Sequence, residues 1–271
     1  VNLQLRNFSW STNLVFSYNK NKLLNYGILN SYQNTSGNKV NATYFPGYSL
    51  LPLFAYRYAG LDVMGDPIIR LQNGSTTKAF NAAGVDDVAY QGTIVPKISG
   101  GFSNTFSYKG LSLSANMIFN LGHVMRRDVN DFYTGRLTGA TTSFIGNISA
   151  YFNNRWKKPG DEAFTDIPAY VSNINDSYNR RDLNYYFKGD VNVVSASYIK
   201  LRDITMSYSI PSSMLRHLKM QAVNVFVQAT NFMIWKNNDL GIDPEFQNLS
   251  AGTRNIPPFK HSFSVGTNIT F

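Results

Sequence analysis

The fold is decided by the stretch LSLSANMIFNL, which runs from Leu111 to Leu121. Its odd-numbered positions are all apolar, and its even-numbered positions are serine or asparagine except for Ile118. Successive side chains of a β-strand point to opposite faces, so this alternation predicts a strand with one apolar and one polar face.

A second strand is expected directly before it. Ile98 to Tyr108 alternates in the same way, although Asn104 interrupts its apolar side. Lys109-Gly110 separates the two segments, and a two-residue connection containing glycine is typical of a β-hairpin. The two segments are therefore predicted to pair antiparallel.

The same alternation recurs along the chain and predicts about six strands. Phe226 is an apolar exception on an otherwise polar side. Val1 to Leu5 is expected to be the tail of a preceding strand, and Met214 to Leu218 one helical turn. The predicted strands cover residues 8–20, 97–108, 111–122, 197–210, 222–235 and 260–271.

The chemistry of the two faces distinguishes a membrane sheet from a soluble one. A soluble sandwich usually carries many charges on its solvent face, whereas serine, threonine, asparagine and glycine dominate the polar face here. An apolar face with aromatic ends suits lipid, and an uncharged polar face suits a wet lumen. The fold class is therefore predicted to be all-β, an antiparallel transmembrane β-barrel. The residues expected to face the lumen are Asn116, Asn120, Asp203, Asn224 and Gln228.

The connections between strands differ greatly in length. Short turns are expected at Lys109-Gly110 and after Pro211, and long loops at about 22–96, 123–196 and 236–259. Outer-membrane barrels have short periplasmic turns and long extracellular loops. The three long loops are therefore predicted to be extracellular, with a short helix around Asp128 to Leu137.

Composition excludes several classes of protein. The 271 residues contain no cysteine, so there is no disulfide framework. No segment approaches the ~20 consecutive apolar residues of a membrane helix. The net charge of +9 lies mainly at strand ends and turns; residues 123–195 carry nine Lys/Arg against eight Asp/Glu. Nucleic-acid grooves need clustered charge, so no nucleic-acid partner is predicted.

The sequence contains no recognisable catalytic or cofactor motif. We find no phosphate-binding loop, no HExxH and no GxSxG, so neither an enzyme nor a cofactor is predicted. His123, His217 and His261 lack metal-ligand spacing, and no metal site is predicted. The pairs Asp86-Asp87 and Asp161-Glu162 are interpreted as turn residues, with calcium ligation as the alternative.

Several segments, in order along the chain, resemble motifs of the SusC/RagA-type TonB-dependent transporters. The similarity covers essentially the whole chain. The segment Gly241 to Glu245 (GIDPE) resembles the family's GYDPE, and we interpret Pro244 as stiffening that loop. The other matching segments are 96–109, 154–160, 197–211, 225–232 and 268–271.

The resemblance implies an active importer in the outer membrane of a Gram-negative bacterium. Such barrels have ~22 strands and a plugged lumen. The family imports oligosaccharides or peptides, is energised by TonB-ExbB-ExbD from the periplasm, and uses a SusD-like lipoprotein as a lid. Residues 1–271 would be the C-terminal part of the barrel, and the missing N-terminal part would contact TonB. About six strands cannot close such a barrel.

Aromatic and arginine side chains in the loops and near strand ends are the candidates for ligand or lid contacts. Aromatic faces stack on sugars, and arginine supplies directional hydrogen bonds. The alternative is that these aromatics pack the loops together. The candidates are Arg136, Trp156, Tyr185, Tyr186, Trp235 and Arg254. The last strand is expected to carry the barrel-assembly signal, formed by Phe263, Val265, Ile269 and Phe271.

Two other function classes remain compatible with the alternation. One is a passive porin or structural barrel, which would lack a plug and a TonB-contacting segment. The other is a soluble carbohydrate-binding β-sandwich, which would fold without detergent.

Overall fold

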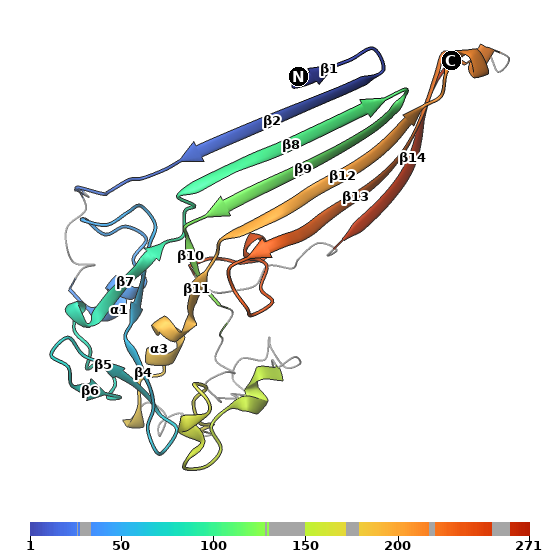
Figure 1. Cartoon of the computed structure of the whole chain (residues 1–271). Coiled ribbons are helices and arrows are strands. Elements are labelled where there is room, and N and C mark those ends of the chain that lie inside the picture. The colour runs from blue at the N-terminus through green and yellow to red at the C-terminus, as the bar shows by residue number, and fades with distance from the viewer. Residues whose placement is uncertain are drawn as a thin grey trace.

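The computed structural model describes residues 1–25, 27, 34–127, 129, 150–171, 179–216, 220–250 and 261–271. A long antiparallel sheet forms one part of the molecule, and a body of connecting segments lies at one end of its strands (Figure 1). The order of the seven strands in the sheet is β1-β2-β8-β9-β12-β13-β14. Their bounds are β1 Leu3–Gln4, β2 Phe8–Tyr18, β8 Ile98–Tyr108, β9 Leu111–Leu121, β12 Tyr198–Ser209, β13 Ala222–Lys236 and β14 Ser262–Thr270.

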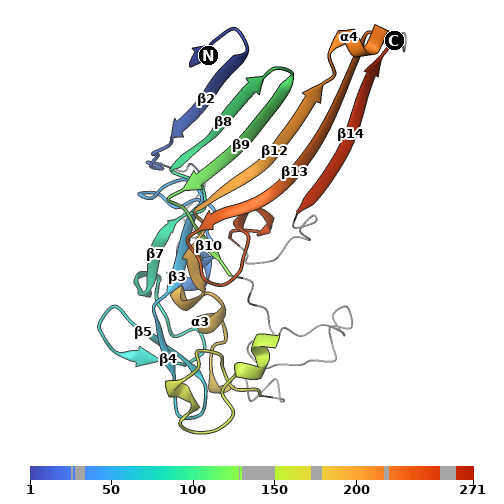
Figure 2. The same cartoon turned by 45° about the vertical axis from the view of Figure 1, so that its right-hand side comes forward.

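The six strands predicted from alternation are all present, with ends that differ by a few residues. The expected tail of a preceding strand is β1, which pairs with β2. All neighbouring pairs are antiparallel, and the sheet curves along its strands (Figure 2). The antiparallel all-β architecture is therefore confirmed.

Strand register arranges side chains of one kind in rows that cross the sheet. Residues paired across antiparallel strands lie on the same face. One row on the polar face consists of Asn13, Ser103, Asn116, Asp203, Thr230 and Ser262. One row on the apolar face consists of Trp10, Phe106, Leu113, Met206, Val227 and Val265. The alternation seen in single strands is thus preserved over the whole sheet.

The two exceptions to the alternation are accommodated locally. On the apolar face, the side-chain oxygen of Asn104 accepts hydrogen bonds from the Trp10 indole at 3.0 Å and the Thr12 hydroxyl at 2.7 Å. On the polar face, the Phe226 ring lies over Gly266, where an added Cβ would be 2.5 Å from a ring carbon. Covering a strand glycine with an aromatic ring is a known way to stabilise such a site.

Short turns and both termini gather at the end of the sheet away from the connecting body (Figure 1). Lys109 and Gly110 have φ values of 46° and 87°, as a type I′ hairpin requires. After Pro211 the chain forms the one-turn helix α4 (Ser212–Leu215). The helical turn predicted at Met214–Leu218 thus begins earlier, and residues 217–219 lie outside the described residues.

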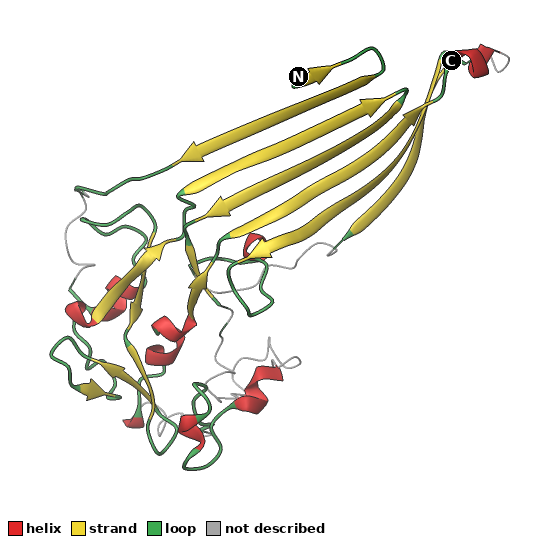
Figure 3. Ribbon diagram, viewed as in Figure 1, coloured by secondary structure: helices red, strands yellow, loops and turns green. Residues whose placement is uncertain are grey.

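At the other end, the long connections contain their own secondary structure (Figure 3). Three small sheets form there, with strand orders β3-β7, β4-β5-β6 and β10-β11. Their strands are β3 Pro52–Tyr56, β4 Tyr58–Leu61, β5 Pro67–Arg70, β6 Thr76–Thr77, β7 Val88–Thr93, β10 Val124–Arg126 and β11 Val193–Ser195. The helices are α1 Ser36–Val40, η2 Val85–Asp87, η5 Ala150–Asn154, η6 Asp161–Ala163, α3 Asn184–Phe187, η7 Asp190–Asn192 and η9 Pro244–Phe246. The helix predicted around Asp128–Leu137 lies outside the described residues, apart from Val129.

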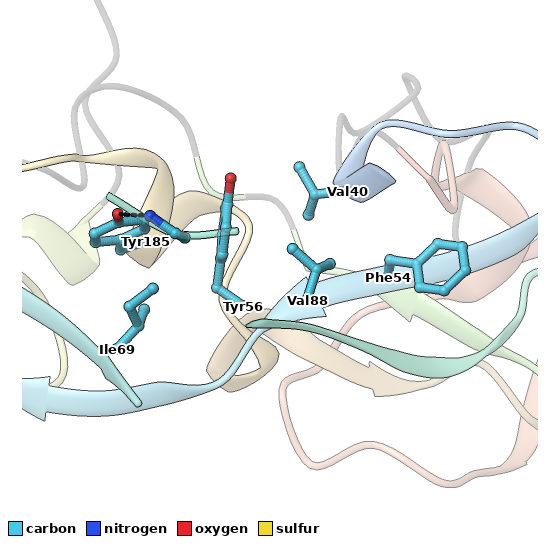
Figure 4. Close-up of a cluster of buried hydrophobic side chains, with 7 residues drawn as sticks. Val40, Phe54, Tyr56, Ile69, Val88 and Tyr185 are labelled. Carbon is cyan, nitrogen blue, oxygen red and sulfur yellow. Dashed lines mark hydrogen bonds between the residues drawn. The ribbon is translucent and has the colours of Figure 1, made fainter. Parts of the chain in front are cut away.

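We call the described residues of the first two long connections, within 34–93 and 123–196, the loop body. It has a hydrophobic core formed by Val40, Phe54, Tyr56, Ile69, Ala83, Val88 and Tyr185 (Figure 4). Tyr185 comes from the second connection, and the other six residues come from the first. The Tyr185 hydroxyl accepts a hydrogen bond from the Ala83 N–H at 3.1 Å and donates to the Ala79 carbonyl at 3.0 Å. The two connections therefore fold as one unit.

A buried ionic cluster joins the same two connections. The Asp66 side chain is fully buried and lies within 2.6 Å of Arg180, 3.0 Å of Lys78 and 3.4 Å of Arg181. Arg181 is also fully buried. Removing one partner of a buried ion pair leaves an uncompensated charge, which is much more costly than losing an exposed pair.

We predict that Asp66→Asn strongly destabilises the loop body. The substitution keeps the size of the side chain but leaves Arg180 and Arg181 without their carboxylate, so the expected loss is roughly 3–5 kcal/mol. Asp166→Asn is the matched control, because Asp166 is exposed in the same body. Protease sensitivity of the loop body measures the effect. Equal sensitivity of the two variants would contradict the structural role of Asp66.

A second prediction concerns two adjacent glycines of β8. A Cβ at Gly100 would lie 2.1 Å from the Val15 carbonyl oxygen of β2 and 2.5 Å from the Phe119 ring. A Cβ at Gly101 would meet only the Met117 carbonyl oxygen, at 3.4 Å. Gly100→Ala should therefore separate β2 from β8 and lower the unfolding free energy by about 1–3 kcal/mol. Gly101→Ala should change it little. Urea unfolding checks this, and a similar loss in both variants would refute the close approach at Gly100.

Candidate binding surface

The five residues predicted to share the polar face do share it. The register places Asn116 opposite Asp203, and Gln228 opposite Thr205 on the same side. The Asn116 amide donates to the Asp203 carboxylate at 2.9 Å, and the Asn120 amide donates to the Tyr198 hydroxyl at 2.7 Å. These bonds hold polar side chains in fixed orientations along the centre of the sheet.

Asn224 belongs to the same face, nearer the end with the short turns. Its register partners are Ser209 and Asn268. Its side-chain oxygen is buried and has no hydrogen-bond partner within the described part of the chain. A buried amide oxygen normally accepts at least one hydrogen bond. This position therefore needs a water molecule or a polar group from outside the described sheet.

An ion-pair cluster holds the third long connection against the polar face. Lys200 of β12 is buried, and its Nζ lies 2.8 Å from Asp243 and 2.6 Å from Glu245. Arg202 also pairs with Glu245. Burial alone would raise the pKa of Glu245, but hydrogen bonds from Lys200 and Arg202 lower it, so this carboxylate is ionised at neutral pH.

Sequence reasoning found the GIDPE segment but not this role. The Asp243 side chain accepts the Glu245 N–H at 3.1 Å, so the segment has the defined loop architecture that the sequence predicts. The missed signal was Lys200 and Arg202, two cations within a strand whose faces are otherwise almost uncharged. Charges in such positions indicate a partner elsewhere in the chain.

Tyr185 and Tyr186, two of the candidate ligand contacts, are fully buried. Their rings pack edge-on against Tyr56 and Tyr58 respectively. Neither ring has a face that a sugar or peptide can reach in this structure. The expectation of direct ligand contact is corrected here, because the one-turn helix α3 points both side chains into the loop body. They pack the loops together, as the alternative interpretation proposed.

Trp156 is half-buried and also serves the loop body. Its indole N–H donates to Glu162 at 3.0 Å, and an added Cβ on Gly65 would lie 2.5 Å from its ring. Gly65 has a φ of 73°, so both its backbone and its lack of a side chain suit this contact. A ligand could therefore contact Trp156 only through the exposed part of its indole, and this role stays a prediction.

The paired carboxylates act as acceptors for turns. Asp161 accepts the Lys157 and Lys158 N–H groups at 3.0 and 3.1 Å, and Glu162 accepts the Gly160 N–H at 2.8 Å. Asp87 likewise accepts the Gly84 N–H at 2.7 Å. Within the described ranges, no three residues of metal-binding type are grouped.

Trp235 lies on the apolar face, opposite Ile199. It therefore points away from the polar face, and its role as a ligand or lid contact stays a prediction. Its position, 43% exposed near the end of β13 beside the loops, is that of an interfacial aromatic. Arg136 and Arg254 lie outside the described residues.

The apolar face is exposed over its whole width. Monomeric soluble proteins rarely expose a continuous apolar surface of this extent. Side chains at least half exposed on this face include Leu14, Phe16, Tyr18, Tyr108, Met206, Phe263 and Val265. Phe263, Val265 and Ile269 of the predicted assembly signal lie on this face of the edge strand β14, and Phe271 follows it. No helix in the described ranges has the length and apolar character to cross a bilayer.

Comparison with known proteins finds TonB-dependent receptors and a peptide transporter. No family model matches the chain. The TonB-dependent receptor P26 of Formosa agariphila is 25% identical over 300 residues, covering 100% of this chain and 28% of the receptor. The TonB-dependent receptor P39 of the same organism is 26% identical over 213 residues, covering 76% of this chain and 19% of the receptor.

A solved structure of the RagAB peptide transporter has the same fold. It superposes with a TM-score of 0.66 at 21% identity, covering 99% of this chain and 28% of that chain. This chain spans less than a third of the length of the relatives it matches. The similarity along the whole chain confirms the predicted resemblance to the SusC/RagA-type TonB-dependent transporters.

Proposed function

We propose that this chain is part of an outer-membrane TonB-dependent transporter that imports oligosaccharides or peptides. The observation that carries the proposal is the sheet itself, with one continuous exposed apolar face and one nearly uncharged polar face. The relatives supply the transport class, since they are TonB-dependent receptors and a peptide transporter.

The exposed apolar face fits lipid as its solvent. In a bilayer every backbone polar group needs a partner within the protein, so only helices and closed barrels cross it. In the seven-stranded sheet, β2, β8, β9, β12 and β13 each have a neighbour on both sides, whereas β1 and β14 are its edges. We infer that further strands complete the barrel, with residues 1–271 as its C-terminal part. The edge strand β14 would carry the assembly signal.

The polar face suits the inside of such a barrel. Asn116, Asp203 and Gln228 would line a wet lumen or contact a plug domain. The unpaired oxygen of Asn224 fits this proposal, because water or a plug residue would satisfy it there. Energy would come from TonB-ExbB-ExbD through a part of the protein outside this chain.

The loop body would lie outside the cell. The short turns and the loop body are at opposite ends of the sheet, which is the asymmetry of outer-membrane barrels (Figure 1). The connections at about 22–96, 123–196 and 236–259 would then meet the substrate and a SusD-like lipoprotein lid. A folded loop body offers such a partner a defined surface. Its residues are ordered before binding, so binding would cost less conformational entropy.

We predict that Met117→Arg destabilises the protein in lipid far more than Asn116→Arg. Met117 lies opposite Phe102 and Leu201 on the apolar face. An arginine there near the bilayer midplane costs about 2–4 kcal/mol. An arginine at position 116 stays on the polar face, opposite Asp203. Urea unfolding of the full-length protein in lipid vesicles measures both. Equal losses would contradict the assignment of the faces and favour a soluble sandwich.

Import itself is tested in cells. Deleting the gene should abolish uptake of at least one compound from a panel of oligosaccharides and peptides, and deleting tonB should have the same effect. Uptake that depends on this gene but survives loss of TonB would instead indicate a passive porin.

The orientation is tested in intact cells that produce a Gly160→Cys variant. The new cysteine in the loop body should react with biotin-maleimide without permeabilisation. Labelling only after permeabilisation would reverse the orientation.

A further inference from the structure

A cavity of about 190 Å³ lies between the loop body and the third long connection. Its walls come from residues 40–43 and 51–53, together with Ile94, Arg126, Lys188 and Ser250. A water molecule occupies ~30 Å³ of the liquid, so the cavity has room for a polar group several times larger than one water molecule. Two of the lining residues are cations, and none is an acid.

Arg126 is held by one side of its guanidinium only. The residue is 3% exposed, and its Nη2 donates to the Phe54 and Val40 carbonyls. Its Nη1 is buried and has no hydrogen-bond partner within the described part of the chain. The backbone bonds fix the guanidinium in place and leave one nitrogen with unused donors.

Lys188 provides the second cation. Its backbone is fixed, since its carbonyl accepts the Tyr56 N–H at 2.9 Å and its own N–H donates to Asn184 at 2.8 Å. Burial lowers its pKa, and the positive charge of Arg126 lowers it further. Among the described residues, no carboxylate contributes to the pKa shift of either residue.

Arg181 differs from Arg126 in having a carboxylate partner. Arg181 is equally buried but lies 3.4 Å from the carboxylate of Asp66. Burial lowers the pKa of Arg126 to about 10, so it is still charged at neutral pH. A buried charge without a counterion is costly. Among the described residues, neither the buried Arg126 nor the half-buried Lys188 has a carboxylate partner at this cavity.

We propose that this cavity binds an oxyanion borne by a ligand, a sulfate ester or a carboxylate, through Arg126 and Lys188. Arginine suits this chemistry because its planar donors match the geometry of carboxylate and sulfate oxygens. Lys188 adds a second charge, and Thr43 also lines the cavity. The exposed position of Thr43 places the opening of the cavity on the surface.

Calorimetry on the purified full-length protein tests the proposal. Sulfate and glucuronate are titrated at constant ionic strength with chloride as the balancing ion, and glucose serves as the neutral analogue. We expect sulfate and glucuronate to bind and glucose not to. Lys188→Gln should weaken the binding of both anions at least tenfold. Lys157→Gln is the control, because it removes the same charge from an exposed site in the same body, and it should have no effect.

The other outcomes are equally informative. Absence of sulfate binding, or binding unchanged in Lys188→Gln, would overturn the proposal and leave water as the occupant. Binding of sulfate without glucuronate would overturn the carboxylate as the group that the cavity binds. Arg126→Lys separates charge from geometry: it should lose most of the affinity if the guanidinium donors bind the anion. A crystal soaked in selenate should show an anomalous peak in the cavity. None of these readouts depends on transport.

Discussion

The structure depends on the register between neighbouring strands. Because side chains alternate along a strand, a slip of one residue would move every apolar side chain of that strand to the polar face. The Lys109-Gly110 turn sets the register of β8 and β9, and each further strand continues the same rows. Even the exceptions respect this constraint, since Asn104 and Phe226 each find a partner on the face where the register puts them.

The loop body depends on contacts of a different kind. β10 follows β9, β11 precedes β12, and the two short strands pair with each other at the base of the second connection. The second connection then packs against the first. There Tyr185 fills the core of residues contributed by the first connection, and Asp66 neutralises Arg180 and Arg181. Lys200 holds the third connection by ion pairs with Asp243 and Glu245. Each long connection is thus fixed by at least one buried or charged contact, which explains how such long segments can remain folded.

This difference decides what the sequence could predict. Strand positions, faces and the two short turns follow from local alternation and turn residues, so all six strands were predicted. The polar-face residues were found for the same reason. The loop body could not be predicted, because its contacts join residues far apart in the chain, as Asp66 and Arg180 are. Tyr185 and Tyr186 show the limit for the binding surface: an aromatic pair in a polar loop has the same sequence whether its rings are exposed or buried. Trp235 shows another limit, since only the register assigns its face.

Buried cations offer a physical way to separate structural from binding roles in this molecule. Arg181 and Lys200 are buried beside carboxylates that the chain itself supplies, so their charges stabilise the contacts between connections. Arg126 is buried and Lys188 is half-buried, and neither has such a carboxylate within the described part of the chain, so no ion pair there offsets their desolvation. The backbone bonds of Arg126 explain why the residue stays in place, but they leave its charge unbalanced. An anion bound from outside the chain would balance the charge of Arg126, as proposed for the cavity.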